Sequence, residues 1–243
     1  MGTTLQAGIL TPGNPSEGVR LHNEFLARRA GISKDSHVLD AGCGFCGPAI
    51  DAARSLPGCR FEAITISSRQ AALASEQVKR AGLTENIQVL VADYHRLPFR
   101  DQQFDVVQFL ESSMHSANPE QLFAETFRVL KPGGRLYIKD GFIKEIRTGE
   151  EEDAHRAMDD LFRMRTRTLS DTTSLIEAAG FAVTGTQALT GMVNARHFLD
   201  AMLEQHDHPE GQRTRLGDAL YPSSGSIEPF NWPIIGEVIA HRP

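Results

Sequence analysis

The chain has 243 residues, of which 40% are hydrophobic and 23% are charged, and its formal net charge at pH 7 is −6. This length and composition are typical of one α/β domain with an insertion, and the acidic balance argues against a nucleic-acid partner. No apolar run approaches the roughly 18 residues of a membrane span, and residues 1–15 lack a secretion-signal pattern, so we expect a cytoplasmic protein.

The predicted elements alternate between strand and helix from residue 37 onward. An N-terminal arm and a covering helix (17–30) should occupy residues 1–34, with Gly31 as the stop. We expect strands near 37–41, 60–66, 87–92, 103–110, 134–140 and 181–183, a closing strand at 234–240, and helices near 47–56, 68–81, 118–130 and 171–179. This order predicts a mostly parallel sheet with helices on both faces and a ligand site at the carboxyl ends of its strands.

The same pattern divides the chain into a core and an insertion. The core should span residues 35–184, and residues 234–243 should supply its closing strand. Residues 185–233, a helical and turn-rich stretch, should form a lid or a substrate wall. No internal repeat is evident.

The first strand ends in a glycine-rich turn, V-L-D-A-G-C-G-F-C-G, over residues 38–47. A strand, a glycine turn and a helix together favour nucleotide binding, because glycine admits a close ligand and a helix N-terminus presents free N–H groups. Tight strand-to-helix turns also need glycine for steric reasons alone. Three cysteines, Cys43, Cys46 and Cys59, form no disulfide framework, and we expect structural or cofactor-lining roles rather than metal or redox chemistry.

Three further polar segments follow predicted strands and should share the edge with this turn. They are T-I-S-S-R-Q from Thr65, A-D-Y from Ala92, and E-S-S-M-H from Glu111. A dinucleotide-binding protein usually ends its second strand with Asp or Glu, but this chain has Thr65 there.

Taken together, these segments resemble class I S-adenosylmethionine-dependent methyltransferases over residues 36–142. The motifs are V-L-D-A-G-C-G, A-D-Y-H-R-L-P-F-R-D-Q-Q-F-D and R-V-L-K-P-G-G-R-L. The resemblance implies a Rossmann-like, seven-stranded fold and S-adenosyl-L-methionine as cofactor. It also implies that the cofactor contacts Asp40, Gly42, Gly44, Thr65, Ser67, Gln70, Asp93 and Tyr94. One hydroxyl at Thr65 cannot reproduce the bidentate carboxylate expected at the ribose.

A narrower resemblance is to methyltransferases that act on alkene carbons. Thr65-Ile-Ser with Gln70 is similar to the T-L/I-S-x-x-Q of cyclopropane fatty acid synthases and of tocopherol, sterol and geranyl diphosphate methyltransferases. F-D-V-V-Q-F-L-E-S-S-M-H from Phe104 is similar to the sterol enzymes, and E-S-S-M is close to the E-S-T-M of the geranyl diphosphate enzyme. No counterpart of the large sterol-binding C-terminal region is evident, so a sterol is a poor acceptor for this chain.

The chemistry gives Glu111 a candidate catalytic role. When the π electrons of an alkene attack a sulfonium methyl group, a carbocation forms that needs a nearby negative group and then a base. Glu111 could serve as either, or could instead bind cofactor or cap the next turn. His115 is the second catalytic candidate, as a helper or a phosphate contact, and a structural role is equally open.

The acceptor site is predicted from arginine and aromatic side chains. On an extended segment Arg163, Arg165 and Arg167 would share a face and meet a diphosphate, whereas on a helix they would spread apart in solvent. Phe198 and Trp232 are candidates for an apolar wall. Acidic residues between 150 and 160 form either a solvated face or part of a divalent-metal site, so Mg²⁺ is considered only for a diphosphate acceptor.

The sequence thus predicts a cytoplasmic C-methyltransferase of secondary metabolism that methylates an alkene carbon of a small isoprenoid, with a prenyl diphosphate as the leading acceptor. The alternatives are an O- or N-methyltransferase of a small natural product and a catalytically silent cofactor-binding protein. We expect no nucleic-acid partner and no membrane span, and a homo-oligomer stays open.

Overall fold

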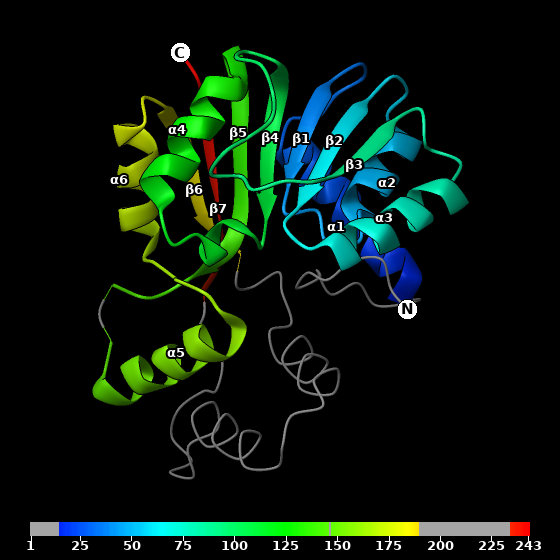
Figure 1. The fold of residues 1–243 in the computed structure, drawn as a ribbon. Coiled ribbons are helices and arrows are strands. Elements are labelled where there is room, and N and C mark those ends of the chain that lie inside the picture. Colours follow the sequence, from blue (N-terminus) through cyan, green and yellow to red (C-terminus); the bar gives the residue numbers. More distant parts are fainter. Residues whose placement is uncertain (1–14, 146, 190–233) are drawn as a thin grey trace.

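The computed structural model describes residues 15–145, 147–189 and 234–243 (Figure 1). The predicted N-terminal arm, most of the predicted insertion, and the candidate acceptor residues Phe198 and Trp232 lie outside the described residues. Within the described part, seven strands form one sheet in the order β3-β2-β1-β4-β5-β7-β6.

The strands are β1 (His37–Ala41), β2 (Arg60–Thr65), β3 (Ile87–Val91), β4 (Phe104–Leu110), β5 (Leu130–Phe142), β6 (Ala182–Ala188) and β7 (Ile234–His241). The helices are α1 (Pro15–Arg29), α2 (Gly47–Ser55), α3 (Ser68–Arg80), α4 (Pro119–Val129), α5 (Gly149–Phe162) and α6 (Leu169–Ala178), with a 3₁₀ turn, η1 (Ser113–His115). Strands β1 to β5 pair in parallel, and β7 runs antiparallel to both β5 and β6. The predicted mostly parallel, seven-stranded sheet is therefore confirmed.

Each face of the sheet carries its own hydrophobic cluster, and successive residues of a strand alternate between them. On β5, Tyr137 belongs to the cluster that includes residues of α1, α2 and α3, whereas Leu136 and Ile138 belong to the cluster under α4 and α6. Figure 1 shows these helices on the two sides of the sheet. The alternation directs Lys139 toward the α1 side and Asp140 toward the α4 side.

Helix α5 was not expected from the sequence. It begins with a capping box, in which the Thr148 side chain accepts from the Glu151 backbone N–H and Glu151 accepts from the Thr148 N–H. The T-x-x-E spacing is a recognisable helix start, so this signal was present in the sequence. In Figure 1 the helix lies beyond the edge of the sheet at which β4 ends.

Two strands extend past their predicted ends because β7 supplies hydrogen-bonding partners. Strand β5 continues to Phe142, which pairs with Ile234, and β6 continues to Ala188, which pairs with Gly236. Strand β6 therefore continues past residue 184. None of the helices among the described residues is long and apolar enough to cross a membrane.

Candidate functional site

The glycine turn after β1 presents one buried carboxylate at the carboxyl edge of the sheet. The Oδ1 atom of Asp40 accepts a hydrogen bond from Gln108 Nε2 at 3.0 Å, while its Oδ2 is buried without a partner among the described residues. Burial raises the pKa of Asp40 to about 6, and the Gln108 hydrogen bond opposes the shift. A buried, unsatisfied carboxylate oxygen fits the methionine amino group of the expected cofactor, held directly or through water.

The turn packs so closely against Ser112 that position 42 requires glycine. A Cβ atom at Gly42, where φ is +90°, would lie 2.4 Å from Ser112 Cβ. Gly44 and Cys46 also have positive φ, and Cys46 makes no side-chain cap at the start of α2. The first N–H groups of α2 therefore have no capping side chain, which suits an anionic cofactor group. All three cysteines are buried free thiols.

At the end of β2 the Thr65 hydroxyl is already engaged within the protein. It donates to Gln70 Oε1 at 2.8 Å and accepts from the Ser67 N–H at 3.2 Å. The Ser67 side chain in turn caps α3 by accepting from the Gln70 N–H. These hydrogen bonds fix the loop and orient the Gln70 side-chain amide. Thr65 contacts the amide oxygen and not the amide nitrogen. Gln70 is accordingly better placed than Thr65 to supply a hydrogen bond to the ribose.

Asp93 and Tyr94 follow β3 and are tied to the loop after β4. Asp93 Oδ1 accepts from the backbone N–H and the Nδ1 of His95, whose Nε2 lies 2.8 Å from Ser116 Oγ. The Asp93 side chain is 50% exposed, so its second oxygen is accessible to a donor such as an adenine amino group. Tyr94 packs edge-on against Phe109, and its hydroxyl donates to the Ser112 carbonyl at 3.4 Å.

Glu111 follows β4 with a left-handed backbone, at φ +56°. Its carboxylate pairs with the ammonium group of Lys139, whose side chain is fully buried while that of Glu111 is 7% exposed. On the same side of the sheet, burial and the Lys139 charge lower the pKa of His22 to about 3, so its imidazole is neutral. Glu111 is therefore a carboxylate whose charge is balanced by a neighbouring cation.

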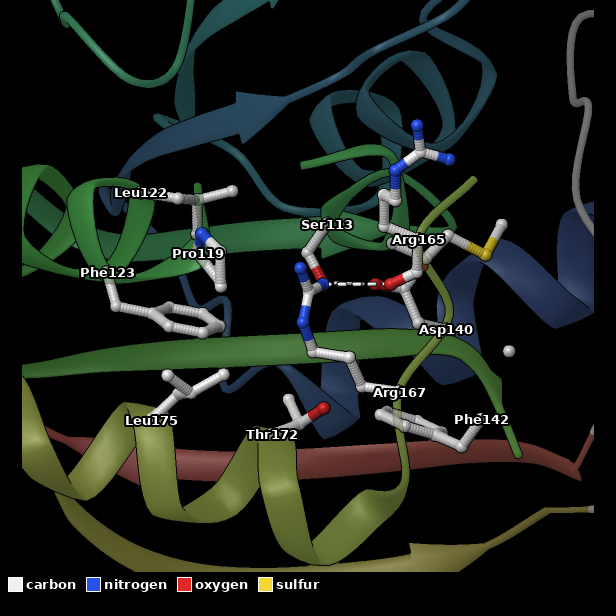
Figure 2. Close-up of a pocket in the computed structure, with 12 residues that line it drawn as sticks. Ser113, Pro119, Leu122, Phe123, Asp140, Phe142, Arg165, Arg167, Thr172 and Leu175 are labelled. Atoms are coloured by element: carbon white, nitrogen blue, oxygen red, sulfur yellow. Dashed lines mark hydrogen bonds between the residues drawn. The ribbon is translucent and has the colours of Figure 1, made fainter. Parts of the chain in front are cut away.

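A second carboxylate, Asp140, lies on the other side of β5. It is 1% exposed, one of its oxygens accepts from the Ser113 hydroxyl, and its Oδ1 is buried with no side-chain partner among the described residues. Burial raises its pKa to about 7; Glu111 adds to the rise, whereas the Ser113 hydrogen bond and Lys139 oppose it. Asp140 and Ser113 line a narrow pocket that is partly open to solvent (Figure 2).

The arginine segment is extended, as one of the two sequence interpretations required. Met164 and Thr166 are buried, whereas Arg165 is exposed and Arg167 is half-buried. Among the described residues, the guanidinium groups of Arg165 and Arg167 donate to the backbone carbonyls of Met164, Arg165 and Ser116. The carboxylates of Glu120, Asp159 and Asp171 act on Arg167 electrostatically. Both arginines line the pocket of Asp140, and the guanidinium group of Arg165 points away from the Ser113–Asp140 hydrogen bond in Figure 2.

Arg163 and His115 meet beside this segment. Arg163 ends α5 with a left-handed backbone, its side chain is exposed, and its carbonyl accepts from His115 Nδ1 at 3.2 Å. The Nε2 of His115 is thereby left as the proton-accepting nitrogen. Arg163 does not line the pocket, so the three predicted arginines are brought together only in part.

The structure adds polar residues that sequence reasoning missed, chiefly Gln108, Ser113, Lys139 and Asp140. Gln108 interrupts the apolar run of β4, and Lys139-Asp140 follows the apolar Leu136-Tyr-Ile, so both signals were visible. Their partners were not, because each contact joins different strands or loops.

Three acidic residues near the start of α5 are engaged in ion pairs. Glu151 pairs with Lys144, Glu152 with Arg147, and Asp153 with Arg156. Within the described residues, no cluster of three or more His, Cys, Asp or Glu side chains could hold a metal ion. These contacts favour a solvated, ion-paired face for the helix.

Comparison with known proteins finds a family model that matches these motifs. Residues 39–138 match the family model described as a methyltransferase domain. A sterol 24-C-methyltransferase of Eremothecium gossypii is 36% identical over 124 residues, which cover 51% of this chain and 33% of that protein. The chain spans only about a third of the length of the curated relatives it first matches.

Solved structures share the fold over nearly the whole chain. The [4+2]-cyclase SpnF has a TM-score of 0.78 at 20% identity and covers 99% of this chain and 88% of its own. A geranyl diphosphate methyltransferase in complex with S-adenosylmethionine has a TM-score of 0.75 at 20% identity and covers 98% of both chains. Identities this low support the fold alone. With the matched domain, they confirm the resemblance to class I S-adenosylmethionine-dependent methyltransferases.

Proposed function

We propose that this chain, whose residues 39–138 form a methyltransferase domain, transfers a methyl group from S-adenosylmethionine to an alkene carbon of a small isoprenoid. The observation that carries the proposal is the Glu111 carboxylate, fixed at the end of β4 next to the Asp40 turn and paired with buried Lys139. The ion pair fixes the position of this carboxylate, and a fixed carboxylate oxygen at this edge suits a reaction that creates positive charge on carbon. The likeness of the domain to a sterol 24-C-methyltransferase supports the same chemistry.

The cofactor would be held by residues from three strand ends. Asp40 would receive the methionine amino group, the backbone at Gly42 and Gly44 would border the methionine moiety, and Gln70 with Ser67 would face the ribose. Asp93 would accept from the adenine amino group, with Tyr94 beside the ring. When bound, the cofactor supplies an electrophilic methyl group on a sulfonium.

We further propose a prenyl diphosphate as the acceptor. Arg165 and Arg167 line the pocket, and their guanidinium groups donate to backbone carbonyls rather than to carboxylates. Guanidinium groups match the geometry of phosphate oxygens, and the apolar wall of Leu122, Phe123, Phe142 and Leu175 suits a hydrocarbon chain. The solved neighbour that acts on geranyl diphosphate makes this compound the first acceptor to assay.

The test is incubation with methyl-labelled S-adenosylmethionine and geranyl diphosphate, with product structure determined by mass spectrometry and NMR. We expect the label on a former alkene carbon. Glu111→Gln should lower kcat by roughly 10²- to 10³-fold, because it removes a charge aimed at the cation. A product labelled only on oxygen or nitrogen would exclude C-methylation, and full turnover by Glu111→Gln would exclude the role of this residue.

The acceptor assignment has its own test. Arg165→Ala and Arg167→Ala should each raise KM for geranyl diphosphate about tenfold and leave the affinity for S-adenosylhomocysteine unchanged. Arg80→Ala, which removes an exposed charge on α3, is the matched control. Equal KM values for the diphosphate and its uncharged alcohol would contradict a diphosphate subsite.

One observation favours a second candidate function. His115 Nε2 is left as a proton acceptor near the pocket, which is also the requirement for O- or N-methylation of a small natural product. In that case His115→Gln should abolish turnover of hydroxyl or amine acceptors, whereas the alkene reaction should tolerate it.

A further inference from the structure

We propose that Asp140 accepts the proton that the methylated intermediate loses, and that Glu111 stabilises the cation without being protonated. This division of labour rests on the proposed C-methylation. The alkene π electrons form the new C–C bond while the S–CH₃ bond breaks and leaves its electron pair on sulfur. A C–H bond next to the cation then breaks, its electrons restore a double bond, and the proton passes to the Asp140 carboxylate and later to solvent.

The position of Asp140 is the first support. It lies near the carboxyl end of β5, one residue after Lys139, and lines the pocket together with Gly141 and Phe142. The Ser113 hydroxyl and the Met114 backbone hydrogen-bond to the carboxylate and fix its rotamer, and Oδ1 is buried with no side-chain partner among the described residues. A buried carboxyl atom without a donor is costly unless a function uses it.

The environment of Glu111 is the second support. Protonating Glu111 would remove the counter-charge that it provides to the ammonium of Lys139, which is 0% exposed. Nearby His22 is neutral and supplies no negative charge. Loss of one charge from a buried ion pair is strongly unfavourable, so the geometry assigns the proton transfer to Asp140 rather than to the ion-paired Glu111.

The electrostatics of Asp140 agree with this geometry. Its pKa of about 7, raised first by burial, poises the group to take up a proton near neutral pH and to release it again. The charged and titratable groups that face it are Glu111 after β4, Lys139 on β5, Tyr94 after β3, and Arg165 and Arg167 of the extended segment. The general rule that paired acids with different environments take different roles applies here to Glu111 and Asp140.

The experiment compares Asp140→Asn with Glu111→Gln under saturating S-adenosylmethionine and geranyl diphosphate between pH 5 and 9. Asparagine keeps an oxygen for the Ser113 hydroxyl, so the fold should survive. We expect wild-type kcat to rise with pH and level off near pH 7. Asp140→Asn should lower kcat about 10²- to 10⁴-fold at an unchanged KM and lose this rise. Glu111→Gln should be slower but keep it.

Two further variants separate catalysis from structural support. Asp140→Glu should recover part of the rate, because it returns a carboxylate. Ser113→Ala should shift the rise in kcat to higher pH, because it removes a hydrogen bond that favours the ionised carboxyl. A purely structural role for Asp140 predicts neither effect.

The outcomes are distinct. If the wild-type protein forms the product and Asp140→Asn has activity within twofold of wild type, the assignment of Asp140 alone is overturned. The same holds if the pH-dependent rise in kcat is lost in Glu111→Gln but kept in Asp140→Asn. Absence of any C-methylated product from the wild-type protein would overturn the proposed function, and this assignment with it.

Discussion

Two carboxylates lie at the carboxyl edge of the sheet and differ in the group that each one contacts. Glu111, after β4, faces the buried ammonium of Lys139, whereas Asp140, on β5, faces the neutral hydroxyl of Ser113. They interact with each other, yet lie toward opposite faces of the same sheet. One step along β5, from Lys139 to Asp140, changes the face of the sheet to which a side chain points. Glu111 therefore has the ammonium group of Lys139 as its direct partner, whereas Asp140 is buried against a neutral hydroxyl, and this burial raises the pKa of Asp140.

The largest expected effect follows removal of the ammonium group from the Glu111–Lys139 ion pair. Lys139→Met should lower the free energy of unfolding by about 3–5 kcal/mol, because Glu111 would lose its buried counter-ion. Urea unfolding monitored by circular dichroism measures the loss. The double variant Lys139→Met/Glu111→Gln, which removes both charges, should recover much of it. A single variant as stable as wild type would show that the pair contributes nothing to folding.

The burial of the Asp140 carboxyl group should make the free energy of unfolding depend on pH. An unfolded Asp has a pKa of about 3.9, whereas folded Asp140 has a pKa of about 7, so between these values the folded state binds more protons and raising the pH favours unfolding. Below about pH 4 the penalty is absent, and above about pH 7 it is complete.

The free energy of unfolding of Asp140→Asn, measured relative to wild type, should therefore rise by roughly 2–4 kcal/mol as the pH increases from 4 to 8. Unfolding curves at several pH values test this. The exposed Asp153→Asn on α5 is the control and should show little change in relative stability. A pH-independent difference between Asp140→Asn and wild type would mean that Asp140 is ionised in the folded protein.

The segment 111–113 contains Glu111 and also Ser113, the hydrogen-bond partner of Asp140. Gly42 packs directly against Ser112 of this segment. Gly42→Ala would bring a methyl group to 2.4 Å from Ser112 Cβ at a positive φ, so it should cost roughly 2 kcal/mol more than Gly82→Ala. Gly82 also has a positive φ but has nothing within 4 Å, which makes it the matched control. We also expect weaker binding of S-adenosylhomocysteine by Gly42→Ala alone, measured by calorimetry. Equal losses for both variants would contradict the close packing.

The smallest effect should follow loss of the Ser113 hydroxyl. Ser113→Ala removes one hydrogen bond to Asp140 and should cost about 1 kcal/mol in thermal or urea unfolding at pH 8, where the carboxyl is ionised. At pH 5, where Asp140 is protonated, the cost should be smaller. A larger cost at pH 5 than at pH 8 would contradict the described role of the hydroxyl.

Much of the fold followed from local pattern. The strand near residues 37–41, the helices at 68–81 and 118–130, and the closing strand are marked by apolar runs, by caps such as Ser67 and Asn118, and by glycine stops. Each of these signals acts within a few residues, so it is legible in a chain read alone. The missed helix α5 carried such a signal in the capping-box pair Thr148 and Glu151.

The candidate site likewise combines features that the sequence predicts with contacts that it does not. The sequence by itself determined the glycine turn, the polar residues at the strand ends and the methyltransferase resemblance, because these depend on residue type and order. Only the tertiary structure decided that Glu111 pairs with Lys139, that Asp40 meets Gln108, and that Asp140 is buried against Ser113. Those contacts join segments 27 to 68 residues apart, and the charge state of a carboxyl depends on what packing brings to it rather than on its neighbours in the chain.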